Sequence, residues 1–164
     1  MALQTLEAPR RRVLRFSSFD EVVADAQRAR DQQFVQLGNW SLGKALSHLG
    51  AGMDASIDGV PFPASLRTRI LGRLLYRYVI LYWRFPPGAR LPRETAKVLV
   101  PQHDTDFEEG MQALRRGIDR LATETRRFAH PVVGRMSVSQ WNRFHLRHAE
   151  LHLSFFAPPD AGRH

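Results

Sequence analysis

Apolar residues recur every three or four positions along much of this chain, which is the spacing that gathers them on one face of an α-helix. The clearest case begins near Thr105 and continues to Phe128. Its apolar stripe consists of Phe107, Met111, Leu114, Ile118, Leu121 and Phe128. Similar patterns predict helices over residues 17–34, from Ser41 through Met53, and over 137–156. A more uniformly apolar helix is predicted over 65–84, where a central position or a subunit contact would cover more than one face.

Polar residues at the starts of these stretches have the side chains that cap helices. Ser41 is a predicted N-cap, because its hydroxyl can accept a hydrogen bond from the first turn. The pairs Thr105/Glu108 and Ser137/Gln140 each have the spacing of a capping box. Prolines and glycine at residues 86–88 end the apolar helix, and we expect residues 89–104 to be irregular and to line a site.

Five helical segments and no convincing strand predict an all-α fold in one domain, with the helices packed as an antiparallel bundle. The bundle domain is predicted over residues 17–156. A basic lead-in occupies residues 1–16, and residues 157–164 form a flexible tail.

Two histidines interrupt the apolar face of the last predicted helix. At about 100° per residue, His148 and His152 share a stripe with Trp141, Phe144 and Phe155, whereas Arg147 and Glu150 fall on the opposite side. Imidazoles four residues apart can reach one metal ion. The alternative is a pair of hydrogen-bonded core histidines, since buried polar groups need partners.

A catalytic metal site needs about three protein ligands and an open position. His48 is the best third candidate, because it flanks the apolar stripe of another helix beside Ala45 and Gly52. A single histidine on an apolar face is more often a hydrogen-bonded core residue than a metal ligand, and His48 taken alone has that explanation. His145 is either a support for the site or exposed, and His103 and His130 are expected in loops.

Composition narrows the function classes. The net charge is +8, yet the arginines are scattered and no groove-reading motif accompanies them, so we expect no nucleic-acid partner. Arginines on solvated helix faces explain the charge, and an anionic small-molecule substrate is the more specific alternative. Without cysteine the chain has no thiolate metal site. No signal peptide or membrane span is evident, and a cytoplasmic location is expected.

Two motifs resemble the DinB-like superfamily, in its branch of uncharacterised bacterial proteins. One is the segment 38–49, with Trp40-Ser41 and His48-Leu49; the other is 130–152, with His130-Pro131, Trp141 and His148-x-x-x-His152. Asp58-Gly59 and the Pro-Pro-Gly at 86–88 also fit, so the likeness extends from about Phe16 to Phe156.

The resemblance implies a four-helix bundle of up-down-down-up type, often a homodimer. It also implies a divalent ion, zinc or nickel, held by His48, His148 and His152. Relatives include S-transferases that use low-molecular-weight thiols, maleylpyruvate isomerase-like enzymes and hydrolases, and some relatives have lost the metal. This chain has Leu151 and Phe155 where family members often have a second histidine or a glutamine, so its chemistry around the metal differs.

These observations predict a metal-dependent enzyme, a transferase or hydrolase of a small, anionic substrate. Arginines around the metal site could hold such a substrate. The candidate rim of the site is formed by Arg90, Arg93, Lys97 and His103. The alternative is a non-catalytic helical protein that binds a small ligand or a protein partner. No catalytic residue beyond the metal ligands is identifiable.

Overall fold

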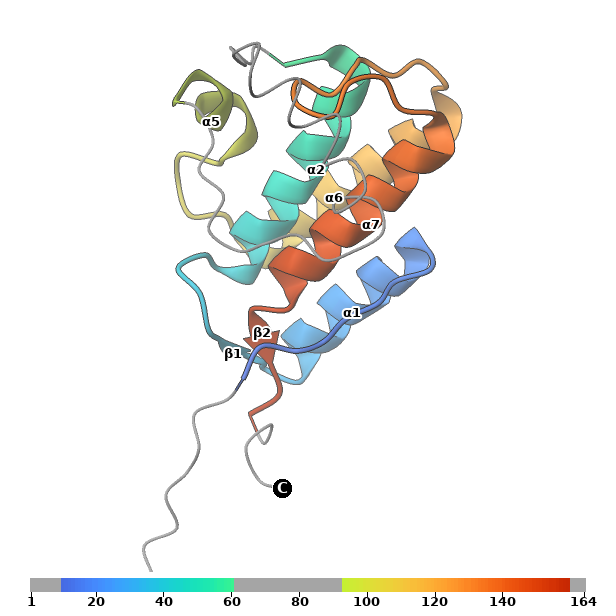
Figure 1. Cartoon of the computed structure of the whole chain (residues 1–164). Coiled ribbons are helices and arrows are strands. Elements are labelled where there is room, and N and C mark those ends of the chain that lie inside the picture. The colour runs from blue at the N-terminus through green and yellow to red at the C-terminus, as the bar shows by residue number, and fades with distance from the viewer. Residues whose placement is uncertain (1–9, 61–92, 160–164) are drawn as a thin grey trace, which may run out of the picture.

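The computed structural model describes residues 10–60 and 93–159, and within these ranges the chain is predominantly helical (Figure 1). The described elements in chain order are α1 (Phe19–Asp31), β1 (Val35–Gln36), α2 (Leu42–Asp58), α5 (Arg93–Leu99), α6 (Phe107–Thr123), α7 (Val138–Leu153) and β2 (Phe156–Ala157). The helix predicted over 65–84, with its proposed subunit contact, lies outside the described residues. None of the described helices is long and apolar enough to cross a membrane.

Helices α2 and α6 form the closest helix pair, and glycines allow their backbones to approach. A Cβ added at Gly43 or Gly110 would collide with backbone atoms of the opposite helix or its cap, and one at Gly50 would lie 2.5 Å from the Ala113 carbonyl oxygen. Gly43 faces residue 106, and Gly50 faces residue 113, so the two helices run in the same direction. Small residues therefore place α2 against α6 at a fixed register.

Helix α7 runs antiparallel to α2, and α1 lies beside α7 (Figure 1). Apolar side chains of α1, α2, α6 and α7 share one core. Its most buried members are Val22, Ala26, Leu46, Leu49, Met53, Leu114, Ala149 and Leu153. This core fixes the rotation of α7, and with it the direction in which the histidines of α7 point.

Several element boundaries differ from the sequence predictions. The N-cap of α6 is Asp106, which accepts a hydrogen bond from Glu109, rather than Thr105 with Glu108. Helix α6 ends at Thr123, because the next residues are extended and the Phe128 N–H donates to the Ser56 carbonyl. The segment predicted to be irregular, residues 89–104, contains helix α5. The Ser41 cap and the Ser137/Gln140 capping box are confirmed.

The prediction of no strand is also wrong. Strands β1 and β2 pair antiparallel, with Val35 opposite Ala157 and Gln36 opposite Phe156. The Leu37 N–H extends this contact by donating to the Phe155 carbonyl at 2.8 Å. These short strands join the residues after α1 to the residues after α7, so they anchor the C-terminal end of α7.

Candidate metal centre

His48 projects from the second turn of α2 towards α7. The Ser41 side chain caps α2 by accepting from the Lys44 N–H, and its hydroxyl donates to Asp104 at 2.6 Å. Only 4% of His48 is exposed. Its Nδ1 lies 2.7 Å from the Leu99 carbonyl oxygen at the end of α5. Because a carbonyl can only accept, Nδ1 carries the hydrogen and Nε2 presents a lone pair.

His148 and His152 come from successive turns of α7 and are half-buried. The Nε2 atoms of His48 and His148 lie 3.2 Å apart, and those of His152 and His148 lie 3.1 Å apart. One ligand atom from each of the three residues falls within 4.8 Å of the other two. The three histidines predicted from the sequence are therefore brought together as a group that could hold a metal ion.

The positions of the protons limit the hydrogen bonds that the three rings can make with one another. A ring nitrogen has one in-plane position, which holds either a hydrogen or a lone pair. His148 Nε2 therefore cannot donate to one neighbouring ring and accept from the other; hydrogen bonds to both require one N–H shared between two lone pairs. His48 Nε2 already presents a lone pair. A cation at the meeting point would accept lone pairs from all three rings.

The protonation of the three rings suits the binding of a metal ion. Burial lowers the pKa of His48, although its bond to Leu99 partly opposes the shift. Burial, and then the neighbouring His152 and His48, hold the pKa of His148 well below its usual value. Burial and His48 lower the pKa of His152 to about 3. At neutral pH the imidazoles are uncharged, which is the form that binds metal.

Trp40 forms one wall of the centre. Its ring lies parallel to that of His152, with centroids 5.3 Å apart, and meets the His48 ring edge-on at 5.0 Å. On another side, a Cβ added at Gly52 would lie 3.7 Å from His148 Cε1. The indole therefore bounds two of the imidazoles, and the absence of a side chain at Gly52 leaves room beside the third.

Two contributions to the site were missed by the sequence analysis. The sequence held a signal for the Trp40 indole, since Trp40 immediately precedes the N-cap of the helix that carries His48. The sequence held no signal for the Leu99 carbonyl, because every residue has a backbone carbonyl. Of the predicted rim residues, Arg93, Lys97 and His103 are exposed, and Lys97 pairs with Glu94 at 3.0 Å. Arg90 lies outside the described residues.

Two further histidines of this region, His145 and His130, have other partners. His145 is only 1% exposed, so its alternative placement on the surface is wrong. Its Nε2 donates to Ser56 Oγ at 3.1 Å, because the Ser56 hydroxyl itself donates to the Met53 carbonyl. His130 Nδ1 accepts from the backbone N–H groups of Val132 and Val133. Neither ring belongs to the metal-binding group.

The buried His145 predicts a loss of stability in mild acid. Burial lowers its folded-state pKa to about 3, against an ordinary value of 6.5 in the unfolded chain. As pH falls below 6.5 the unfolded chain takes up a proton first. The contribution of neutral His145 to the free energy of unfolding is therefore complete above pH 6.5. It is lost progressively towards pH 3, at about 1 kcal/mol per pH unit.

Urea unfolding of metal-free protein between pH 7 and 5 measures this slope. The His145→Gln variant keeps a donor for Ser56 but does not titrate, so its stability should fall less steeply with pH than that of the wild type. Equal slopes for the two proteins would contradict the prediction.

Comparison with known proteins gives one match. A family model described as a protein of unknown function (DUF1569) matches residues 8–159. No curated protein and no solved structure matches the chain. The match covers both motifs that carry the three histidines.

Proposed function

Since this chain belongs to the DUF1569 family, whose function is unknown, we propose from its own residues that it is a divalent-metal-dependent enzyme acting on a small molecule. The observation that carries the proposal is the meeting of the three histidines, each of which can turn one ring nitrogen to a common point. His48, His148 and His152 would hold the ion.

The donor set fits zinc or nickel. Imidazole suits both ions, and three nitrogens at about 2.0–2.1 Å from a tetrahedral zinc ion lie about 3.3 Å apart. The separations of 3.1 and 3.2 Å from His148 Nε2 to the Nε2 atoms of His152 and His48 come close to this value. Structural zinc sites have four protein ligands, whereas catalytic sites have three and an open position. Three histidines therefore support a catalytic site.

When bound, such an ion supplies a Lewis acid that polarises a substrate and lowers the pKa of a coordinated water or thiol. The protein's residues contribute the orientation of the site. The Leu99 carbonyl fixes the tautomer of His48, as partners on the second nitrogen do in metal-binding histidines generally. The Trp40 ring restrains His152. Thiol transfer and hydrolysis both suit this arrangement.

The directions of the helices support a bundle like that of the DinB-like superfamily. Helices α2 and α6 run in the same direction, and α7 runs opposite to α2. We propose that α1, α2, α6 and α7 form a four-helix bundle of up-down-down-up type, as the resemblance implies. The same resemblance supports transfer reactions with a low-molecular-weight thiol and assembly as a homodimer.

Metal content tests the proposal directly. The protein would be purified without a histidine tag or chelator, its metals counted by inductively coupled plasma mass spectrometry, and the metal-free form titrated with Co²⁺. We expect about one equivalent per chain, with quenching of tryptophan fluorescence that is largely lost in Trp40→Phe. A wild-type protein that binds no zinc, nickel or cobalt would refute the proposal and favour a non-catalytic helical protein with a small ligand or a protein partner.

A further inference from the structure

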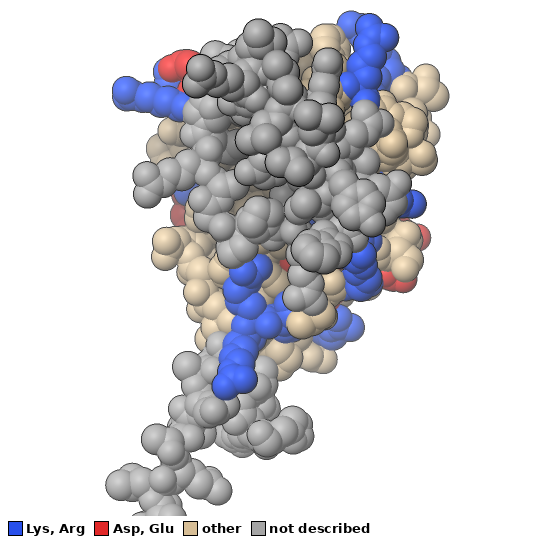
Figure 2. Space-filling view, in the orientation of Figure 1, with Lys and Arg blue, Asp and Glu red and all other residues tan. Residues whose placement is uncertain are grey.

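Helix α5 is a short helix that lies beside α2 (Figure 1). It has seven residues, and helices shorter than about 12 residues are marginal in water on their own. Four of the seven, Arg93, Glu94, Lys97 and Val98, are exposed. Figure 2 shows blue and red side chains projecting at the corner of the molecule where Figure 1 places α5. The position of α5 therefore depends on the contacts that attach it to the rest of the protein.

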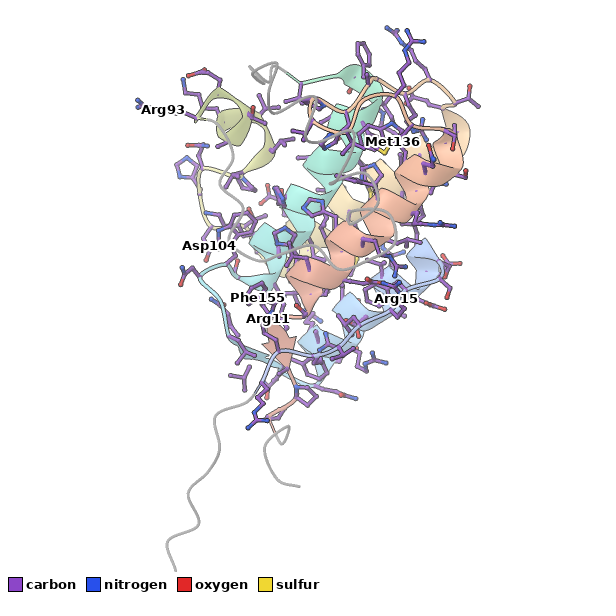
Figure 3. All side chains as sticks on the ribbon, viewed as in Figure 1. Arg11, Arg15, Arg93, Asp104, Met136 and Phe155 are labelled. Carbon is purple, nitrogen blue, oxygen red and sulfur yellow. The ribbon has the colours of Figure 1, made fainter. Side chains whose placement is uncertain are left out.

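Two hydrogen bonds attach the end of α5 and the residues after it to the first turns of α2. The Leu99 carbonyl, in the last residue of α5, accepts from His48 Nδ1 at 2.7 Å. Further along the chain, the Asp104 carboxylate accepts from the Ser41 hydroxyl at 2.6 Å. Figure 3 shows Asp104 beside the start of α2. Residues 99–104 therefore extend from a candidate metal ligand to the N-cap of the helix that carries it.

The hydrogen bond to Leu99 exists in only one of the two tautomers of neutral His48. A neutral imidazole carries one hydrogen, either on Nδ1 or on Nε2. With the hydrogen on Nδ1, the ring donates to Leu99 and Nε2 keeps a lone pair. With the hydrogen on Nε2, the ring can donate to His148 Nε2, which lies 3.2 Å away. The Nδ1 lone pair then faces the Leu99 carbonyl oxygen, and this repulsion favours separation of Leu99 from His48.

A metal ion bound to His48 Nε2 requires the first tautomer. The ion takes the Nε2 lone pair, so the hydrogen must lie on Nδ1, where it bonds to Leu99. In the metal-free protein the two tautomers compete, because each has an acceptor for its N–H. A ligand that binds one state of an equilibrium more tightly shifts the population towards that state, and the effect is reciprocal.

We propose that binding of a divalent ion at His48 and docking of α5 with residues 99–104 on α2 are coupled, so that each favours the other. Asp104 is then a positioning residue, because it holds the docked segment from outside the metal centre. The inference rests on the proposed function, since the ion is the ligand that shifts the equilibrium. It gives the segment that was expected to line a site a second role, which is to set the tautomer and the position of one metal ligand.

Hydrogen exchange followed by mass spectrometry tests the coupling in the full-length protein, with and without Zn²⁺. Peptides that cover residues 93–103 should exchange about fivefold more slowly in the zinc-loaded protein, which is the factor that the usual net contribution of one hydrogen bond gives. Peptides from α1 are the internal control, because general stabilisation by the metal slows their exchange as well. A slowing that is greater in 93–103 than in α1 supports the coupling, and an equal slowing in both overturns it.

Variants of Asp104 test the reciprocal effect. Asp104→Ala removes the attachment at Ser41 but no metal ligand, so it should speed exchange in 93–103 and lower the affinity for Co²⁺ by about fivefold. Asp104→Asn keeps a side-chain oxygen that accepts from Ser41 and should restore most of the affinity. Asp119→Ala removes an exposed carboxylate from α6 and should change neither quantity. The Co²⁺ absorption bands should keep their positions in all three variants, because the same three nitrogens bind the ion.

Metal uptake separates this inference from the proposed function. A wild-type protein that binds neither zinc nor cobalt refutes the proposed function, and the coupling falls with it because it has no ligand. A protein that binds the ion while exchange in 93–103 stays unchanged overturns the coupling alone. Wild-type affinity in Asp104→Ala, or an equal loss of affinity in Asp119→Ala, overturns the positioning role of Asp104.

Discussion

Replacement of His148 by alanine is expected to lower the affinity for zinc or Co²⁺ by more than about 100-fold. Loss of a partner that merely orients a ligand costs 10–100-fold in metal affinity, and loss of a ligand should exceed that. His148 should be the most sensitive of the three, because its Nε2 lies within 3.2 Å of the Nε2 atoms of both His48 and His152. Competition titration against a chromogenic chelator measures the affinity.

Two further variants make the result interpretable. His148→Gln keeps most of the side-chain volume beside Gly52 and Phe144, so a fold that survives in this variant separates lost metal binding from unfolding. His103→Ala removes an exposed histidine outside the group and should leave affinity unchanged. Retention of wild-type affinity in both His148 variants would show that the metal binds elsewhere.

The periodic part of the sequence predicted that His148 and His152 lie together, because that prediction depends on local helix geometry. A spacing of four residues places His148 and His152 on one side of α7, and the Ser137/Gln140 capping box sets where that helix begins. His48 lies on a different helix from the other two histidines. Its place beside an apolar stripe that must pack inward was enough to make it a candidate third ligand. The pairing of α2 with α7 in space, by contrast, came only from the structure.

Contacts between distant segments account for what the sequence did not predict. Arg147 and Glu150 were expected on the polar side of α7, yet both are buried. Arg147 Nη2 donates to the Phe16 carbonyl at 2.6 Å, and Glu150 accepts from the Phe16 N–H at 2.6 Å. The two charges also pair with each other at 2.9 Å. A helical pattern identifies an apolar face, but it does not show that another segment will cover the charged one.

Asp25→Ala is expected to destabilise the protein by about 3–5 kcal/mol, since it leaves a paired cation without its partner. Asp25 is 1% exposed and accepts two hydrogen bonds from Arg12, at 2.8 and 2.7 Å, and another from Arg28. Arg12 also donates to the carbonyls of Leu153 and Phe156. The Asp25 carboxylate therefore holds the N-terminal segment against the end of α7.

Urea unfolding measures the effect, and Asp31→Ala is the matched control. Asp31 is on the same helix but 55% exposed, with Arg30 3.8 Å away, so its loss should change stability by less than about 0.5 kcal/mol. A double variant, Asp25→Leu with Arg12→Met, tests the cause: if the cost of Asp25→Ala comes from the unpaired cation, the apolar pair should recover much of the stability.

A loss below about 1 kcal/mol in Asp25→Ala would mean that solvent readily replaces the carboxylate. The double variant should recover stability without recovering the two carbonyl contacts of Arg12 at the end of α7. Its metal affinity would then show whether those contacts, one turn from His152, are needed to keep the three Nε2 atoms together, separately from the stability of the fold.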